Sequence, residues 1–118
     1  MLAAFPSIIC YWYRFSHDGV KIDPETPCRE LTIAQQQVVE IAKALAQNAR
    51  IIVMDEPTAA LSPHEVEGLF KVVRELRSQG ISIIYISHRL DEIDAIADRV
   101  TILRDGNHVA TRSMDDIQ

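Results

Sequence analysis

Hydrophobic positions along the chain change from a helical to a strand-like spacing and back. From about Ile33 to Asn48 they recur every three or four residues, and polar residues take the opposite face, which predicts an amphipathic helix with Thr32 as its N-cap. The apolar run from Ile51 to Met54 ends in two acidic residues, as expected of a strand buried on both faces of a parallel sheet. The helix positions expected to face inward are Val38, Ile41, Ala42 and Leu45.

A second helix is predicted by its end signals. In the segment SPHE at residues 62–65, Ser62 can cap the helix, Pro63 suits the first turn and Glu65 completes a capping box. We expect this helix to run to about Ser78 and to end at Gly80. Its expected buried positions are Val66, Leu69, Phe70, Val73 and Leu76.

The remaining pattern completes a layered fold. Residues 81–86, ISIIYI, predict a second buried strand, and a further helix is expected to run through Ala97. Residues 99–103 and 108–111 flank Asp105-Gly106, a strong hairpin turn signal. The order strand, helix, strand, helix, hairpin is typical of an α/β domain with a parallel sheet and a C-terminal β-hairpin.

Composition narrows the class of protein. The 118 residues provide one domain at most, and a net charge of -5 argues against a nucleic-acid-binding surface. Cys10 and Cys28 have neither metal nor redox spacing, which favours two reduced thiols. Residues 1–19 are apolar and aromatic, but the run is interrupted by Pro6 and is shorter than the about 20 residues of a membrane span. We leave residues 1–19 unassigned.

Candidate chemistry follows the two predicted strands. Asp55 and Glu56 come directly after the first strand, and His88 comes two residues after the second. Ligands of open α/β sheets bind beyond the carboxyl ends of the strands, so the three side chains could converge there on a magnesium ion, a water and a phosphate. Taken singly, a carboxylate pair after a strand belongs to an ordinary solvated loop as often as to a functional site, and a lone histidine is more often a surface or helix-capping residue than a functional one.

Three segments together resemble a known family. LTIAQQQ at residues 31–37, IIVMDEPTAALS at residues 51–62 and YISHR at residues 85–89 resemble consecutive motifs of ABC transporter ATPases, in family order. The resemblance implies a partial P-loop NTPase domain over residues 20–118, the C-terminal half of a cassette whose N-terminal half is missing. LTIAQQQ followed by VEIAKAL is similar to the importers of ribose, galactose and xylose, and VKIDP at residues 20–24 resembles the first of their two cassettes.

The resemblance also implies roles for individual residues. Asp55 matches the Walker B aspartate that acts on magnesium through water, Glu56 the catalytic glutamate and His88 the switch histidine. The signature segment, which would contact nucleotide in a partner's site, is Leu31, Thr32, Ile33, Ala34 and Gln35, and the D-loop is Ala59, Ala60, Leu61 and Ser62.

The chain departs from the family pattern in three places. Ile33 and Ala34 stand where the signature usually has two glycines, which implies a weakened signature, since glycine lets backbone amides approach a phosphate closely. Ser62 replaces the usual D-loop aspartate, which puts communication between two ATP sites in doubt, although its capping role explains the serine equally well. None of the four glycines precedes the Lys-Ser/Thr pair of a phosphate-binding loop.

The expected function is therefore that of part of a sugar-import ATPase with little or no activity alone. It would use magnesium with ATP only beside a partner that supplies the phosphate loop. The resemblance implies a second cassette, transmembrane permease subunits and, through them, a sugar-binding protein as partners, at the cytoplasmic face of the plasma membrane. Two alternatives stay open. The first is a non-catalytic module that completes or blocks a partner's ATP site. The second is half of a chromosome-maintenance or repair ATPase, which the lack of an upstream heptad run disfavours.

Overall fold

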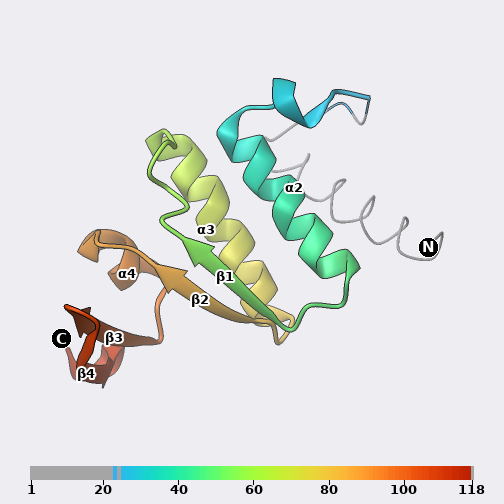
Figure 1. The fold of residues 1–118 in the computed structure, drawn as a ribbon. Coiled ribbons are helices and arrows are strands. Elements are labelled where there is room, and N and C mark those ends of the chain that lie inside the picture. Colours follow the sequence, from blue (N-terminus) through green and yellow to red (C-terminus); the bar gives the residue numbers. More distant parts are fainter. Residues whose placement is uncertain (1–22, 24, 118) are drawn as a thin grey trace. The chain divides into compact units, whose positions relative to one another are not determined.

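The computed structural model describes residue 23 and residues 25–117, in two units, Met1–Ile86 and Ser87–Gln118 (Figure 1). The expectations for residues 1–19 lie outside the described residues. The first unit contains η1 (Cys28–Glu30), α2 (Ile33–Ala46), β1 (Ile51–Asp55), α3 (Pro63–Ser78) and β2 (Ser82–Ile86). The second contains α4 (Leu90–Ile96), β3 (Arg99–Arg104), β4 (Asn107–Ser113) and η2 (Met114–Asp116).

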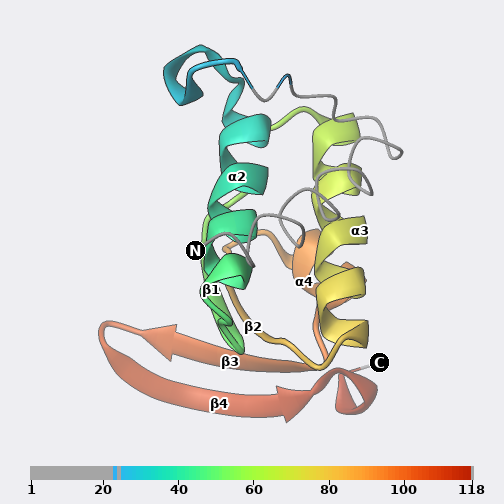
Figure 2. The same cartoon turned by 90° about the vertical axis from the view of Figure 1, so that its right-hand side faces the viewer.

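The first unit is built on a parallel strand pair with α3 as its crossover. β1 and β2 run in the same direction, with Ile51 beside Ser82 and Asp55 beside Ile86. α2 and α3 lie side by side in both views (Figure 2). α3 packs on β2, where the Phe70 ring meets the Tyr85 ring edge-on at a centroid distance of 6.5 Å. The predicted α/β fold with a parallel sheet is confirmed.

The core lies on one face of this sheet. Ile52 and Met54 of β1 point into it, together with the apolar positions of both helices. The buried helix residues are Val38, Ile41 and Ala42 from α2 and Leu69, Phe70, Val72, Val73 and Leu76 from α3. Seven of the nine predicted inward positions are thus among the buried residues, and Val72 was not foreseen.

The prediction that both strands are buried on both faces is wrong for the described residues. The side chains of Ile51 and Val53 are 62% and 60% exposed, and Ile84 and Ile86 of β2 are exposed as well. Successive residues of a strand point to opposite faces, and the described helices cover only the face of Ile52 and Met54. The apolar run is therefore half buried here.

Both long helices begin at the predicted caps. The Thr32 hydroxyl accepts a hydrogen bond from the Gln35 backbone N–H at 3.2 Å, and the Gln35 side chain accepts one from the Thr32 N–H at 2.9 Å. Ser62 and Glu65 form the same reciprocal box at the start of α3. α3 ends as predicted before Gly80, whose φ of 83° suits a glycine.

The second unit contains the predicted hairpin. β3 and β4 pair antiparallel around Asp105 and Gly106, whose φ values of 49° and 75° define the turn preferred in two-residue hairpins. The strands extend beyond the predicted ranges to Arg104 and Ser113, and the register shifts between Ile102 and Leu103. Among the described residues, no helix has the length and apolar character needed to cross a membrane.

Leu76 provides a test of the core. Its side chain is 0% exposed, and Leu76→Ala should lower the free energy of unfolding by about 2–5 kcal/mol, because it leaves a cavity as well as removing buried methyl groups. Leu90, 79% exposed, is the matched control, and its replacement by alanine should change stability by less than about 0.5 kcal/mol. Urea unfolding followed by far-UV circular dichroism measures both, and equal losses would contradict the described core.

Candidate functional site

The site is centred on the carboxyl end of β1. Asp55 is the last residue of the strand, and its side chain is exposed. Glu56 follows at once, and its backbone N–H donates a hydrogen bond of 2.9 Å to the Ile86 carbonyl. This bond continues the ladder one step past the last strand pair, so both strands end at the same edge of the sheet. The two acidic residues thus lie where ligands of parallel sheets bind.

Glu56 has an unusual backbone conformation. Its φ is 46°, in the left-handed region that residues with a β-carbon seldom adopt. The turn there ends the strand and directs the chain to Pro57 and Thr58, which are both buried. A non-glycine residue pays about 1–2 kcal/mol for this conformation, and such residues concentrate at functional sites.

The signature segment forms the start of α2. Leu31 precedes the helix, Thr32 caps it, and Ile33, Ala34 and Gln35 form its first turn. Neither Ile33 nor Ala34 has a positive φ, so the backbone does not require glycine at either position. The two replacements therefore add side-chain atoms beside the helix start without straining it.

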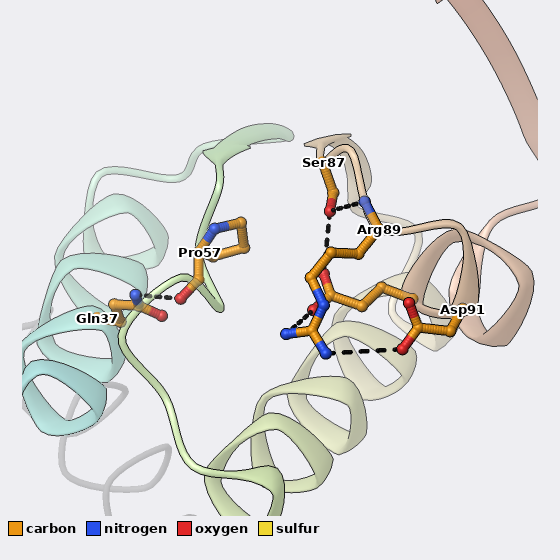
Figure 3. Close-up of polar contacts among 6 residues, drawn as sticks. Gln37, Pro57, Ser87, Arg89 and Asp91 are labelled. Carbon is orange, nitrogen blue, oxygen red and sulfur yellow. Dashed lines mark hydrogen bonds and ion pairs between the residues drawn. The ribbon is translucent and has the colours of Figure 1, made fainter.

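Gln37 joins this helix to the loop after β1. Its side-chain amide nitrogen donates a hydrogen bond to the Pro57 carbonyl (Figure 3). Its amide oxygen is buried and has no hydrogen-bond partner among the described residues. In the sequence, Gln37 is the last residue of the segment LTIAQQQ, for which no individual role was predicted, and its position next to Val38, a predicted inward residue, is the one signal that it could face inward.

The D-loop segment links Pro57 to α3. Ala59 and Ala60 are exposed, and the Leu61 N–H donates to the Thr58 carbonyl at 3.0 Å. Ser62 is the N-cap of α3, and its backbone N–H and its hydroxyl each lie 2.8 Å from Glu65 Oε2. The capping role predicted for Ser62 is confirmed.

The capping box has an electrostatic consequence. Hydrogen bonds from the backbone N–H and then from the hydroxyl of Ser62 lower the pKa of the Glu65 carboxyl below its ordinary value, with a smaller contribution from His64. These bonds favour the charged form more than desolvation disfavours it.

His88 lies in the second unit, two residues beyond β2. Its side chain is exposed, and its neighbours Ser87 and Arg89 are linked to the buried Glu92 of α4. Asp55, Glu56, the signature and the D-loop all belong to the first unit. The convergence of His88 with the two acidic residues stays a prediction.

A groove of about 500 Å³ runs between α2 and β1 in the first unit. It is lined largely by apolar residues, with Gln36, Gln37, Glu40 and Asp55 as its polar members, and none of the described residues that line it is Lys or Arg. A triphosphate is bound by glycine-rich backbone and cationic side chains. The groove by itself therefore does not fit the phosphates of a nucleotide.

The donor set does fit a magnesium ion that is bound mainly by phosphates. Magnesium is commonly held by one or two carboxylates together with waters and substrate phosphates, and the exposed Asp55 carboxylate is suited to hold one of those waters. Among the described residues, no group of three or more His, Cys, Asp or Glu side chains could hold a metal alone. Asp55 would thus act on magnesium, through water, only in the company of a nucleotide.

Comparison with known proteins identifies the family. Residues 12–59 match the ABC transporter family. A solved ATP-binding cassette of an ABC transporter is 34% identical with a TM-score of 0.77, covering 97% of this chain and 43% of that one. A component of the cbiONQ ABC transporter complex from Clostridium perfringens is 25% identical, also with a TM-score of 0.77, over 93% of this chain and 43% of that one. The chain belongs to the ABC transporter ATP-binding family.

Within this family, the chain is similar to sugar import proteins. A ribose import ATP-binding protein of Burkholderia ambifaria is 58% identical over 97 residues, which are 82% of this chain and 19% of the relative. An arabinose import ATP-binding protein of Yersinia pestis is 54% identical over 104 residues, 88% of this chain and 20% of the relative. The chain spans about a fifth of the length of these relatives. The predicted resemblance to sugar-importer ATPases is confirmed.

The left-handed conformation of Glu56 can be tested by glycine substitution. Glu56→Gly should raise the free energy of unfolding by about 1 kcal/mol, because glycine adopts a positive φ without steric cost. Glu67→Gly, at an exposed position within α3, is the control and should lower it by about 1 kcal/mol. Urea unfolding measures both, and a loss of stability in Glu56→Gly as large as in Glu67→Gly would contradict the strained turn.

The Glu65 carboxyl should give a pH-dependent stability. Because its folded pKa is lowered, its contribution is fully present above the unfolded-state pKa, about 4.3, and is lost as the pH falls through the folded pKa. The difference in urea midpoint between the unmodified chain and Glu65→Gln should therefore be constant near neutral pH and shrink below about pH 4. In a Ser62→Ala background the same comparison should vary less with pH, and an equal variation would contradict the assigned cause.

Proposed function

We propose that this chain is part of the ATP-hydrolysing subunit of a carbohydrate importer. The observation that carries the proposal is the placement of two motifs in one unit, with the signature at the start of α2 and the acidic pair at the end of β1. The bond from Gln37 to Pro57 fixes one motif against the other. The identities of 54–58% to ribose and arabinose import proteins support sugar as the transported class.

The acidic pair and the histidine would divide the chemistry of phosphoryl transfer to water. Asp55 would hold magnesium through water, and that ion would neutralise charge on the phosphates. Glu56, the next residue, would orient or deprotonate the attacking water. His88 would contact the phosphate under attack. The left-handed turn at Glu56 would direct the Glu56 carboxylate away from the strand axis.

The signature segment would act on the ATP site of a partner. Its residues, Leu31 to Gln35, lie at a helix start, where backbone N–H groups and the helix dipole favour an anion. The partner would be a second cassette that supplies the phosphate loop and its lysine. Permease subunits and, through them, a sugar-binding protein would complete the assembly at the cytoplasmic face of the membrane.

The 118 residues alone should neither bind nor hydrolyse ATP to a significant extent. They contain no glycine-rich loop followed by Lys and Ser or Thr, and charge-assisted contacts from such a loop supply much of the nucleotide affinity. We expect no saturable binding of ATP to the purified chain, with or without magnesium, by calorimetry, and no release of phosphate above buffer. Turnover that Glu56→Gln abolishes would mean that other residues of the chain cradle the phosphates.

A second arm of this experiment adds the chain to an intact sugar-import cassette. Association that depends on ATP, with a rise in phosphate release, would support completion of the partner's site. Association with a fall in phosphate release would instead favour a blocking module. Absence of any nucleotide-dependent association would contradict a role of the signature segment in a partner's site.

A further inference from the structure

The second unit contains a buried carboxylate to which the proposed function gives no role. Glu92 lies in the first turn of α4, and its side chain is 2% exposed. A carboxylate so removed from water is stable in its charged form only when charged or hydrogen-bonding groups compensate for the lost hydration. The contacts of Glu92 therefore indicate which part of the chain the buried carboxylate holds in place.

Two of its partners are the residues that flank His88. Arg89 Nη1 lies 3.1 Å from Glu92 Oε1, and the Ser87 hydroxyl donates to Glu92 Oε2 at 3.1 Å. The backbone N–H of Arg89 in turn donates to the Ser87 hydroxyl oxygen at 3.1 Å (Figure 3). These contacts close a ring that runs from Ser87 through the Glu92 carboxylate to Arg89 and back to Ser87.

This ring, which we call the Ser87–Glu92–Arg89 ring, encloses the backbone of His88. His88 is the residue between Ser87 and Arg89, so the ring fixes the chain on both sides of it. Arg89 is also the N-cap of α4, and it makes no side-chain capping hydrogen bond. The start of α4 is thus held by a carboxylate inside the helix, in contrast to α2 and α3, where the residue before the helix caps it.

Arg89 also forms an ion pair with Asp91, which allows the structural role of Glu92 to be distinguished from a general ion-pair effect. Asp91 Oδ2 lies 3.6 Å from Arg89 Nη2, but its side chain is 75% exposed. Ion pairs between exposed groups contribute little, because water screens them, whereas a buried carboxylate keeps its hydrogen-bonded partners in place. Glu92 also accepts a hydrogen bond from the Ser87 hydroxyl, which ties it to both residues beside His88.

We propose that Glu92 is a positioning residue that sets the backbone of His88 through the Ser87–Glu92–Arg89 ring. The catalytic side of this inference rests on the proposed function, in which His88 contacts a phosphate. Its geometric side stands on the ring alone. Glu92 would touch neither nucleotide nor water in the reaction, and would act only through the two residues beside His88.

The geometric side can be tested on the whole 118-residue chain by NMR. Glu92→Gln keeps the shape of the side chain and removes its charge, which weakens the charge-assisted bond that holds the Ser87 hydroxyl. Because the Arg89 N–H donates to that hydroxyl, the Arg89 amide should exchange with solvent about tenfold faster. The ring signals of His88 should shift, while those of His108 in the hairpin should not. Asp91→Asn is the matched control and should leave both the Arg89 amide and His88 unchanged.

A third variant keeps the test decisive if Glu92→Gln does not fold. Ser87→Ala removes one hydroxyl from the ring and should speed exchange of the Arg89 amide and shift the His88 signals in the same way. Unchanged exchange and unchanged His88 signals in a folded Glu92→Gln or Ser87→Ala chain would overturn the proposal. Equal effects of Asp91→Asn and Glu92→Gln would overturn it too.

The catalytic side is tested with the chain assembled with a partner cassette. Glu92→Gln should lower kcat about tenfold with KM for ATP unchanged, and it should cause little further loss in a His88→Ala background, because both changes act through the same residue. Additive losses would overturn the positioning role. If the unmodified assembly does not hydrolyse ATP, the proposed function fails, while the amide-exchange result still decides whether Glu92 orders His88.

Discussion

The parallel register of β1 and β2 is the constraint on which the rest of the site depends. Asp55 pairs with Ile86, and the Glu56 N–H then donates to the Ile86 carbonyl, so one strand ends where the acidic pair begins and the other where Ser87 and His88 begin. A slip by one residue would exchange the buried and exposed faces of β1, placing Ile51 and Val53 in the core in place of Ile52 and Met54. Burial of the second pair against the helices therefore also fixes the position of Asp55 and Glu56 at the end of β1.

Local signals predicted the elements well because their physics is local. The capping residues of α2 and α3, the glycine after α3 and the Asp-Gly turn each act within a few residues, and each was found where the sequence placed it. Burial was harder to predict. The run from Ile51 to Met54 is apolar throughout, and its composition does not reveal which faces of the strand the described residues cover.

The contacts that organise the site were invisible for the same reason. Gln37 belongs to a run of three glutamines, and Glu92 lies among acidic residues in a short helix, so both are typical of a solvated surface by composition. Packing against a distant segment makes Gln37 a link to Pro57, and the conformation of the turn before α4 brings Ser87 and Arg89 onto the buried Glu92 carboxylate. Glu56 differs again, because glutamate, unlike glycine, asparagine or aspartate, gives no sequence signal of a positive φ.

The replacement of the signature glycines can now be understood as an exchange between stability and close approach. Ile33 and Ala34 lie in the first turn of a capped helix, where alanine is favoured over glycine by about 1 kcal/mol per residue. Because neither position needs a positive φ, the helix gains stability and the backbone loses nothing. What changes is access, since Ile33 is half exposed and extends its side chain beside the helix start. In the role proposed for residues 31–35, the helix start would offer its dipole and amide groups to a phosphate, while the side chains would limit how closely the phosphate approaches them.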